Sequence, residues 1–177
     1  MLSMRTAFII LLAMLALSAD GQTNMPLSLP EFDKVVIYDF EDQDENLSLV
    51  DGNGALSKAM KIKKQVQLDQ ITIKKLNSTI RDKRSYRQVK ADCFEPHLGL
   101  IWYFKGKIAM VLSVCMDCNV LRSNIYIPAR HKGRTANSSR PYNLNEGMNK
   151  PLRKFLNSLL VKYSFSHQIK PGSAFDR

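Results

Sequence analysis

Two apolar runs on either side of Lys105-Gly106 constrain the fold of this 177-residue chain more than any other feature. They cover residues 98–104 and 108–115. The first run contains four consecutive apolar residues, 100–103, which is typical of a strand buried on both faces. A short connection containing glycine between two such runs predicts an antiparallel hairpin. We therefore expect a hairpin of two buried strands at the centre of a sheet.

Further elements surround this hairpin. The β-branched and aromatic run over 35–40 predicts another strand. One helix is expected after Asp69, a residue suited to an N-cap, and a second is expected to begin at Pro151. Each has apolar residues at helical spacing on one face, namely Ile73, Leu76 and Ile80 in the first, and Leu152, Phe155, Leu156, Leu159, Leu160 and Tyr163 in the second. The expected fold is an α+β domain, with a small antiparallel sheet and its central hairpin packed by two helices.

Turn signals divide the rest of the chain. Residues 51–54, with the sequence DGNG, indicate a turn, so residues 47–50 and the segment after the turn are candidates for a hairpin. We expect a turn over 119–122 and a short strand over 123–127. The basic, polar stretch 129–142 is expected to form a loop.

The first 21 residues have the pattern of a signal peptide. Arg5 precedes an apolar run over 7–17, and small residues follow at positions 16, 18, 19 and 21. A membrane-spanning helix needs about 20 apolar residues, so this run is too short to be one. We expect residues 22–177 to form a single domain without a transmembrane segment, exported to the periplasm or to the outside of the cell.

Charge is divided unevenly along a chain whose net charge is +10. Residues 22–57 hold eight acids and one base, whereas residues 58–177 hold 24 bases and seven acids. A basic body can attract a polyanion or an anionic surface, although the bases are scattered and accompany no nucleic-acid recognition motif. The favoured explanation is therefore that the bases form a solvated face, and a further alternative is that the acidic segment covers part of them.

The hairpin also brings the cysteines together. In a symmetric hairpin around Lys105-Gly106, residues whose numbers sum to 211 face one another, so Leu98 faces Ser113 and Cys93 faces Cys118. A loop longer by one residue shifts this register by one position and keeps Cys93 beside Cys118. Only two residues separate Cys115 from Cys118, and the three cysteines therefore form one expected cluster.

Three chemistries fit this cysteine cluster, and the remaining alternative is that all three cysteines are reduced, buried and inert. In an exported protein the favoured one is a disulfide, either Cys93–Cys118 or Cys115–Cys118, which leaves one cysteine over. The second is a zinc site in which His97 or His131 joins Cys93, Cys115 and Cys118 as the fourth ligand. The chain lacks the second close ligand pair that such sites usually show, so the disulfide is favoured over the metal.

The third chemistry is a redox-active pair, Cys115-x-x-Cys118. Redox cysteines are activated by a helix N-terminus or by positive charge, which lowers the thiol pKa. Here Cys115 ends an expected strand, and the negative charge of Asp117 between the two cysteines would raise their pKa values.

The cysteines and their neighbours resemble a known family. The stretch CFEPHLGLIWY over 93–103 is followed by Gly106-Lys-Ile108 and then by CMDCN over 115–119. This order is similar to that of uncharacterised exported proteins common in Bacteroidetes, with the pattern C-[FY]-x-P-[RH]-x-G-[IL]-x-[FW]-Y, a hairpin turn, and I-C-x-[ED]-C-N. The resemblance implies export and a role for the cysteine cluster. It supplies no activity.

Signals of catalysis are otherwise scarce in the sequence. It contains no G-x-S-x-G, H-E-x-x-H or P-loop pattern, and His97, His131 and His167 fall in different elements. The leading hypothesis is an exported, non-enzymatic protein with a binding or structural role, in which the cysteine cluster holds the hairpin. The alternative is a thiol–disulfide oxidoreductase that uses Cys115 and Cys118.

Overall fold

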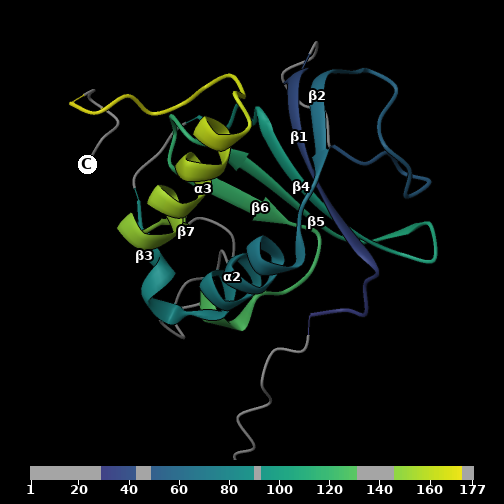
Figure 1. The fold of residues 1–177 in the computed structure, drawn as a ribbon, viewed down its shortest axis with the longest axis horizontal. Coiled ribbons are helices and arrows are strands. Elements are labelled where there is room, and N and C mark those ends of the chain that lie inside the picture. Colours follow the sequence, from purple (N-terminus) through teal and green to yellow (C-terminus); the bar gives the residue numbers. More distant parts are fainter. Residues whose placement is uncertain (1–28, 43–48, 90–92, 131–145, 173–177) are drawn as a thin grey trace, which may run out of the picture.

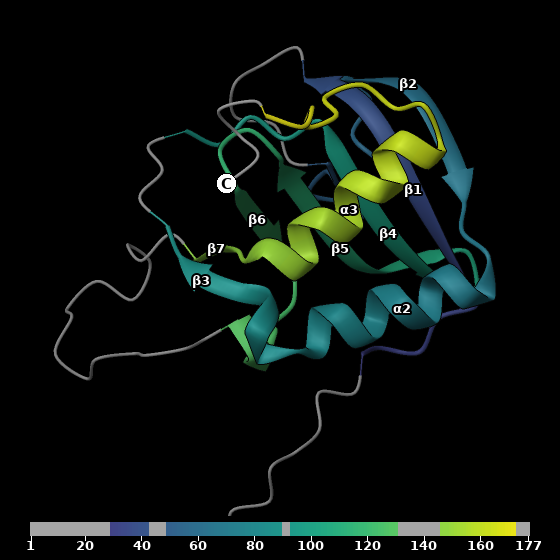
Figure 2. The same cartoon turned by 60° about the vertical axis from the view of Figure 1, so that its left-hand side comes forward.

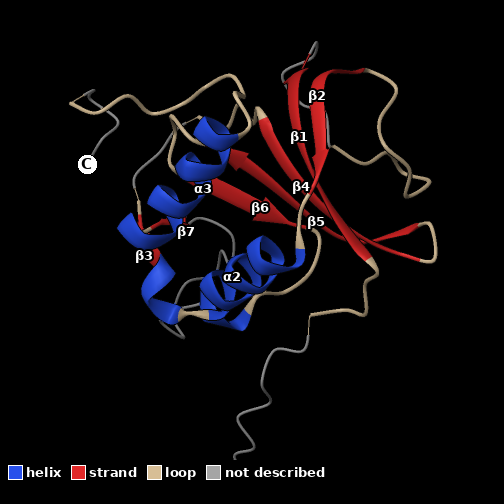
Figure 3. Cartoon of the chain, in the orientation of Figure 1, coloured by secondary structure: helices blue, strands red, loops and turns tan. Residues whose placement is uncertain are grey.

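The fold is built on one sheet of antiparallel strands in the order β2-β1-β4-β5-β6-β7-β3 (Figures 1 and 3). The structure is a computed structural model, and it describes residues 29–42, 49–89, 93–130 and 146–172. The strands are β1 (Lys34–Asp42), β2 (Met60–Gln67), β3 (Tyr86–Gln88), β4 (Leu98–Phe104), β5 (Lys107–Cys115), β6 (Val120–Ser123) and β7 (Glu146–Met148). The expected signal peptide and most of the expected loop over 129–142 lie outside the described residues.

Two α-helices, α2 (Gln70–Arg81) and α3 (Lys150–Lys162), lie on the same face of the sheet (Figures 1 and 2). Two short 3-10 helices, η2 (Lys83–Ser85) and η3 (Pro128–Arg130), complete the helical elements of the described residues. The α+β class expected from the sequence is confirmed. None of the helices in the described part of the chain is long and apolar enough to cross a membrane.

The main core lies between the helices and the sheet. Trp102 of β4 is fully buried there and packs in one cluster with Ile80 of α2 and Leu156 of α3. The indole Nε1–H of Trp102 donates a hydrogen bond of 3.2 Å to the side-chain oxygen of Asn77 on α2. This bond satisfies the one polar group of a buried tryptophan and fixes α2 over β4. A smaller cluster on the opposite face of the sheet includes Phe40 and Ile101.

Helix α2 begins as its sequence predicts. The carboxylate of Asp69 accepts the backbone N–H of Thr72 at 2.7 Å, which satisfies one of the free N–H groups of the first turn. This hydrogen bond, together with one from the Thr72 hydroxyl and the ion pair with Lys162, lowers the pKa of Asp69 to about 2. The helix stops at Arg81, and the side chain of Asp82 then accepts the N–H of Arg84 to start η2.

The central hairpin forms with a different register from the symmetric one. Phe104 faces Lys107 as expected, but an irregularity between Trp102 and Tyr103 shifts the remaining pairs by one residue. Leu98 consequently faces Val114 and not Ser113, so this expectation was wrong. A bulge adds an unpaired residue within a strand, and the sequence carries no signal for its position here.

Two other expectations also need correction. The turn expected over 119–122 is strand β6, and the strand expected over 123–127 is absent, because the chain turns earlier, over residues 116–119. Strand β2 was not predicted, and most of its residues are exposed. Its Lys61 and Lys63 form ion pairs with Glu41 of β1, so part of the acidic segment does contact basic residues.

Candidate functional site

A disulfide joins Cys93 to Cys118 at the end of the hairpin remote from its turn. The two sulfurs are 2.10 Å apart and the two Cα atoms 5.9 Å apart. Cys93 lies ahead of β4, and Cys118 lies in the turn between β5 and β6. The strand ladder of β4 stops at Leu98, so the cysteines meet beyond the paired region. Of the two disulfide pairings that the sequence allowed, this is the one that forms.

The third cysteine is a buried thiol beneath this disulfide. Cys115 is 1% exposed, and its sulfur accepts the backbone N–H of Cys118 at 3.1 Å. Burial raises the pKa of the Cys115 thiol, and the negative charge of Asp117 also raises it. Hydrogen bonds from backbone N–H groups lower this pKa but do not outweigh the effect of burial. The thiolate is the reactive form of cysteine, so a buried thiol with a raised pKa is a poor nucleophile.

The zinc site proposed from the sequence requires Cys93 and Cys118 as separate thiolates beside Cys115. Cys93 and Cys118 are bonded to each other and therefore have no thiolate to offer a metal. Within the described residues, no three His, Cys, Asp or Glu side chains converge on a point where a metal could sit. His131, the other candidate for the fourth ligand, lies outside those residues. Zinc at this cluster stays a prediction.

His97 has a different neighbour, which the sequence did not indicate. Its ring stacks on that of His167, with the ring centroids 3.6 Å apart and the planes 6° from parallel. His97 precedes β4, and His167 belongs to the segment that follows α3. A nitrogen of His167 lies 3.8 Å from a carboxylate oxygen of Asp117, which lies between Cys115 and Cys118. The histidine pair thus holds the C-terminal segment against the cysteine cluster.

Asp39 holds the same segment from the sheet side. This residue of β1 is 4% exposed, and its carboxylate accepts hydrogen bonds from both the backbone N–H and the hydroxyl of Ser166. A buried carboxylate costs free energy unless it is hydrogen-bonded, and here the donors come from a segment 127 residues away in sequence. The segment after α3 is therefore part of the folded structure and not a tail.

The histidine pair predicts acid sensitivity. Burial and the neighbouring charge of His97 lower the pKa of His167, and Lys63 adds to this effect, whereas Asp117 and Asp39 oppose it. The unfolded chain, with a histidine pKa of about 6.5, then binds the proton more readily than the folded one. The stability contributed by neutral His167 is present above about pH 6.5 and is lost as the pH falls below it.

We expect the urea concentration at half-unfolding to decrease when the pH is lowered from 7.5 to 5.5. The decrease should be smaller in a His167→Asn variant. Asparagine is the matched replacement because His167 has a φ of +57°, a left-handed conformation that asparagine tolerates. If the two proteins had the same pH dependence of stability, protonation of His167 would not be the cause of the acid sensitivity.

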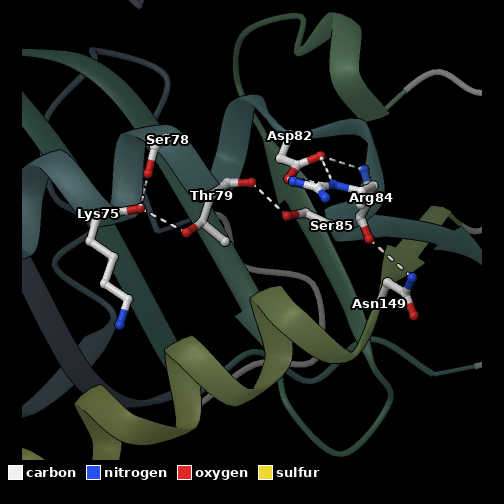
Figure 4. Close-up of polar contacts among 7 residues, drawn as sticks. All are labelled: Lys75, Ser78, Thr79, Asp82, Arg84, Ser85 and Asn149. Atoms are coloured by element: carbon white, nitrogen blue, oxygen red, sulfur yellow. Dashed lines mark hydrogen bonds and ion pairs between the residues drawn. The ribbon is translucent and has the colours of Figure 1, made fainter.

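A second feature of the structure is an open groove of about 570 Å³ between α2 and α3. On the α2 side its wall is made by residues at three- and four-residue spacing, Lys75, Ser78, Thr79 and Asp82, followed by Arg84 and Ser85 of η2. Figure 4 shows these side chains in a row along the end of α2 and η2. We refer to this feature as the helical groove.

The α3 side of the helical groove follows the same spacing. Its wall consists of Pro151, Lys154, Phe155 and Ser158. The start of α3 is attached to η2 by Asn149. Its side-chain N–H donates to the carbonyl oxygen of Arg84 at 3.0 Å (Figure 4). Its backbone N–H donates to the carbonyl oxygen of Ser85 at 2.7 Å. These bonds fix one helix relative to the other, so the groove is preformed.

The groove is cationic. It presents Lys75, Lys154 and Arg84 against a single carboxylate, that of Asp82, and therefore carries a net charge of +2. Arg84 and Asp82 form an ion pair of 2.8 Å, which leaves the two exposed lysines as the available charges. This groove was not predicted, because the sequence does not show that the faces of these two helices meet.

Comparison with family models, with curated proteins and with solved structures finds no match to this chain. The resemblance to exported proteins of Bacteroidetes thus stays a prediction. Function has to be inferred from the two features described above, the cysteine cluster and the helical groove.

Proposed function

We propose that this chain is an exported, non-enzymatic binding protein whose helical groove takes an anionic ligand. The observation that carries the proposal is the groove itself, a preformed open volume of about 570 Å³ with a net charge of +2. Pockets of about 300–1,000 Å³ are the usual size of small-molecule sites. A pocket lined by excess positive charge attracts anions and raises their local concentration.

In this proposal the cysteine cluster has a structural role. The disulfide links the entry of β4 to the turn after β5, and the remaining thiol is buried with a raised pKa. Disulfides of this kind are typical of proteins in oxidising compartments, which supports export.

The oxidoreductase alternative is less well supported. It needs Cys115 and Cys118 as partners with an exposed thiolate, whereas Cys118 is bonded to Cys93 and Cys115 is 1% exposed. No contact of the described residues gives Cys115 a cationic neighbour that would lower its pKa. We therefore propose binding and not thiol–disulfide exchange as the activity.

The test compares two pairs of lysines on an anionic column. Removal of the groove charges in the variant Lys75→Gln/Lys154→Gln should lower the salt concentration at which the protein elutes from heparin. The control, Lys58→Gln/Lys107→Gln, removes the same charge from exposed positions outside the groove and should elute later than the groove variant. Counterion release makes such retention dependent on salt, so the elution position measures the number of contacts.

Equal elution of the two double variants would contradict the proposal, because retention would then reflect the net charge of +10 and not the groove. Circular dichroism of both variants checks that the helices are retained.

A further inference from the structure

We propose that the anionic ligand of the helical groove is an acidic oligosaccharide, a molecule that carries both carboxylates and many hydroxyl groups. This inference rests on the proposed binding function and names the ligand class of the same site. It follows from the hydrogen bonds that the polar groups of the groove walls already make, and from the donor and acceptor positions that they can still offer to a ligand.

The hydroxyl groups in the groove have their hydrogens in use. Ser78 and Thr79 both donate to the carbonyl oxygen of Lys75, at 2.9 Å and 2.7 Å (Figure 4). Ser85 donates to the carbonyl oxygen of Thr79 at 2.6 Å, and Ser158 donates to that of Phe155 at 2.6 Å. A hydroxyl has one donor and two acceptor positions. The hydroxyl of Ser85 is buried, so the other three groups, those of Ser78, Thr79 and Ser158, offer a ligand acceptor oxygens.

The cationic groups, unlike the hydroxyl oxygens, offer a ligand hydrogen-bond donors. Lys75 and Lys154 are exposed and carry three donors each, and a carboxylate is a suitable partner for them. The amine of Lys75 lies 5.4 Å from the centre of the Phe155 ring, which holds it over the groove wall. A matching ligand thus needs negative charge at the lysines and hydrogen-bond donors at the serine and threonine oxygens.

A bare phosphate meets only one of these requirements. It accepts hydrogen bonds from the lysines, but a phosphate ion at neutral pH has few hydrogens for the three accessible hydroxyl oxygens. The start of α3 offers it little more, because Pro151 has no N–H and the N–H of Lys150 donates to the side chain of Asn149 at 2.9 Å. Sugar hydroxyls, in contrast, are donors, and a uronic acid carries them beside a carboxylate.

The experiment uses calorimetry with three probes of similar size: a trimer of galacturonic acid, a neutral trimer of galactose, and inorganic triphosphate. We expect the galacturonate trimer to bind more tightly than either of the others. The groove variant Lys75→Gln/Lys154→Gln should weaken galacturonate binding by about tenfold, because it removes two exposed charge contacts of modest strength. The control Lys58→Gln/Lys107→Gln should leave it within about twofold.

A second variant tests the acceptor oxygens directly. Ser78→Ala/Thr79→Val removes two of them and keeps the charge of the groove, so it should weaken galacturonate binding by about fivefold and leave triphosphate binding unchanged. Unfolding curves of each variant check that the fold is retained.

Failure of this inference can be told apart from failure of the proposed function. Triphosphate that binds as tightly as galacturonate, or galacturonate binding that is insensitive to Ser78→Ala/Thr79→Val, would overturn the ligand class. If the groove lysines also had no effect on heparin retention, the binding function itself would be wrong. If galacturonate showed no binding while the groove lysines still controlled retention on heparin, the ligand class alone would be wrong.

Discussion

Loss of the Cys93–Cys118 disulfide is expected to lower the free energy of unfolding by about 3–4 kcal/mol. The bond closes a loop with a sequence separation of 25 residues, and a cross-link of this length restricts the unfolded chain far more than the folded one. The measurement is a urea titration of the Cys93→Ala/Cys118→Ala variant beside the wild-type protein. Removing both cysteines avoids leaving a new free thiol behind.

The matched control is Cys115→Ala, which removes the buried thiol and leaves the disulfide in place. It should cost about 1 kcal/mol, the loss of one small buried side chain and of the hydrogen bond that its sulfur accepts. If the control were as destabilising as the double variant, packing at the cluster and not the covalent bond would hold this end of the hairpin.

A substitution at Gly147 of β7 should also destabilise the fold, by about 1–3 kcal/mol. A Cβ atom at this position would lie 2.5 Å from the backbone oxygen of Asn119 and 2.5 Å from both methyl groups of Val89. Side chains can move away from such a clash, but the oxygen of Asn119 is fixed, since it accepts the N–H of Met148 at 3.2 Å. Gly147→Ala must therefore push β7 away from the turn that carries the disulfide.

The control for this substitution is Gly52→Ala. Nothing lies within 4 Å of the Cβ that it would add, so its effect should stay within about 0.5 kcal/mol. Chemical unfolding of both variants gives the comparison. Equal stability of the two proteins would mean that β7 can separate from Asn119 without cost.

The helices and the hairpin could be predicted because each carries its own local signal. Asp69 and Pro151 mark the helix starts, and a stripe of apolar residues marks the buried face of each helix. Strand β2 has no such signal, because it lies at the edge of the sheet and exposes most of its residues, including Ile62. Strands β3 and β7 have three residues each, which is too short for a periodic pattern.

The site was predictable to a similar extent. Proximity of Cys93 and Cys118 follows from the hairpin alone and survived both the bulge and the early end of β4. The stacking of His97 on His167 could not be foreseen, because the two residues are 70 positions apart and meet only after α3 has packed on the sheet. The helical groove depends in the same way on the packing of α2 against α3.

We infer that the cysteine cluster is structural, with one disulfide and one thiol that is unreactive in the folded protein. The most direct measurement is alkylation of the purified protein by iodoacetamide, before and after denaturation without reductant, followed by mass spectrometry. We expect no modification of the native protein and a single modified residue, Cys115, in the denatured one, as a structural role of the cluster requires. Rapid modification of Cys115 in the native protein, or a denatured protein with three modified cysteines, would contradict it.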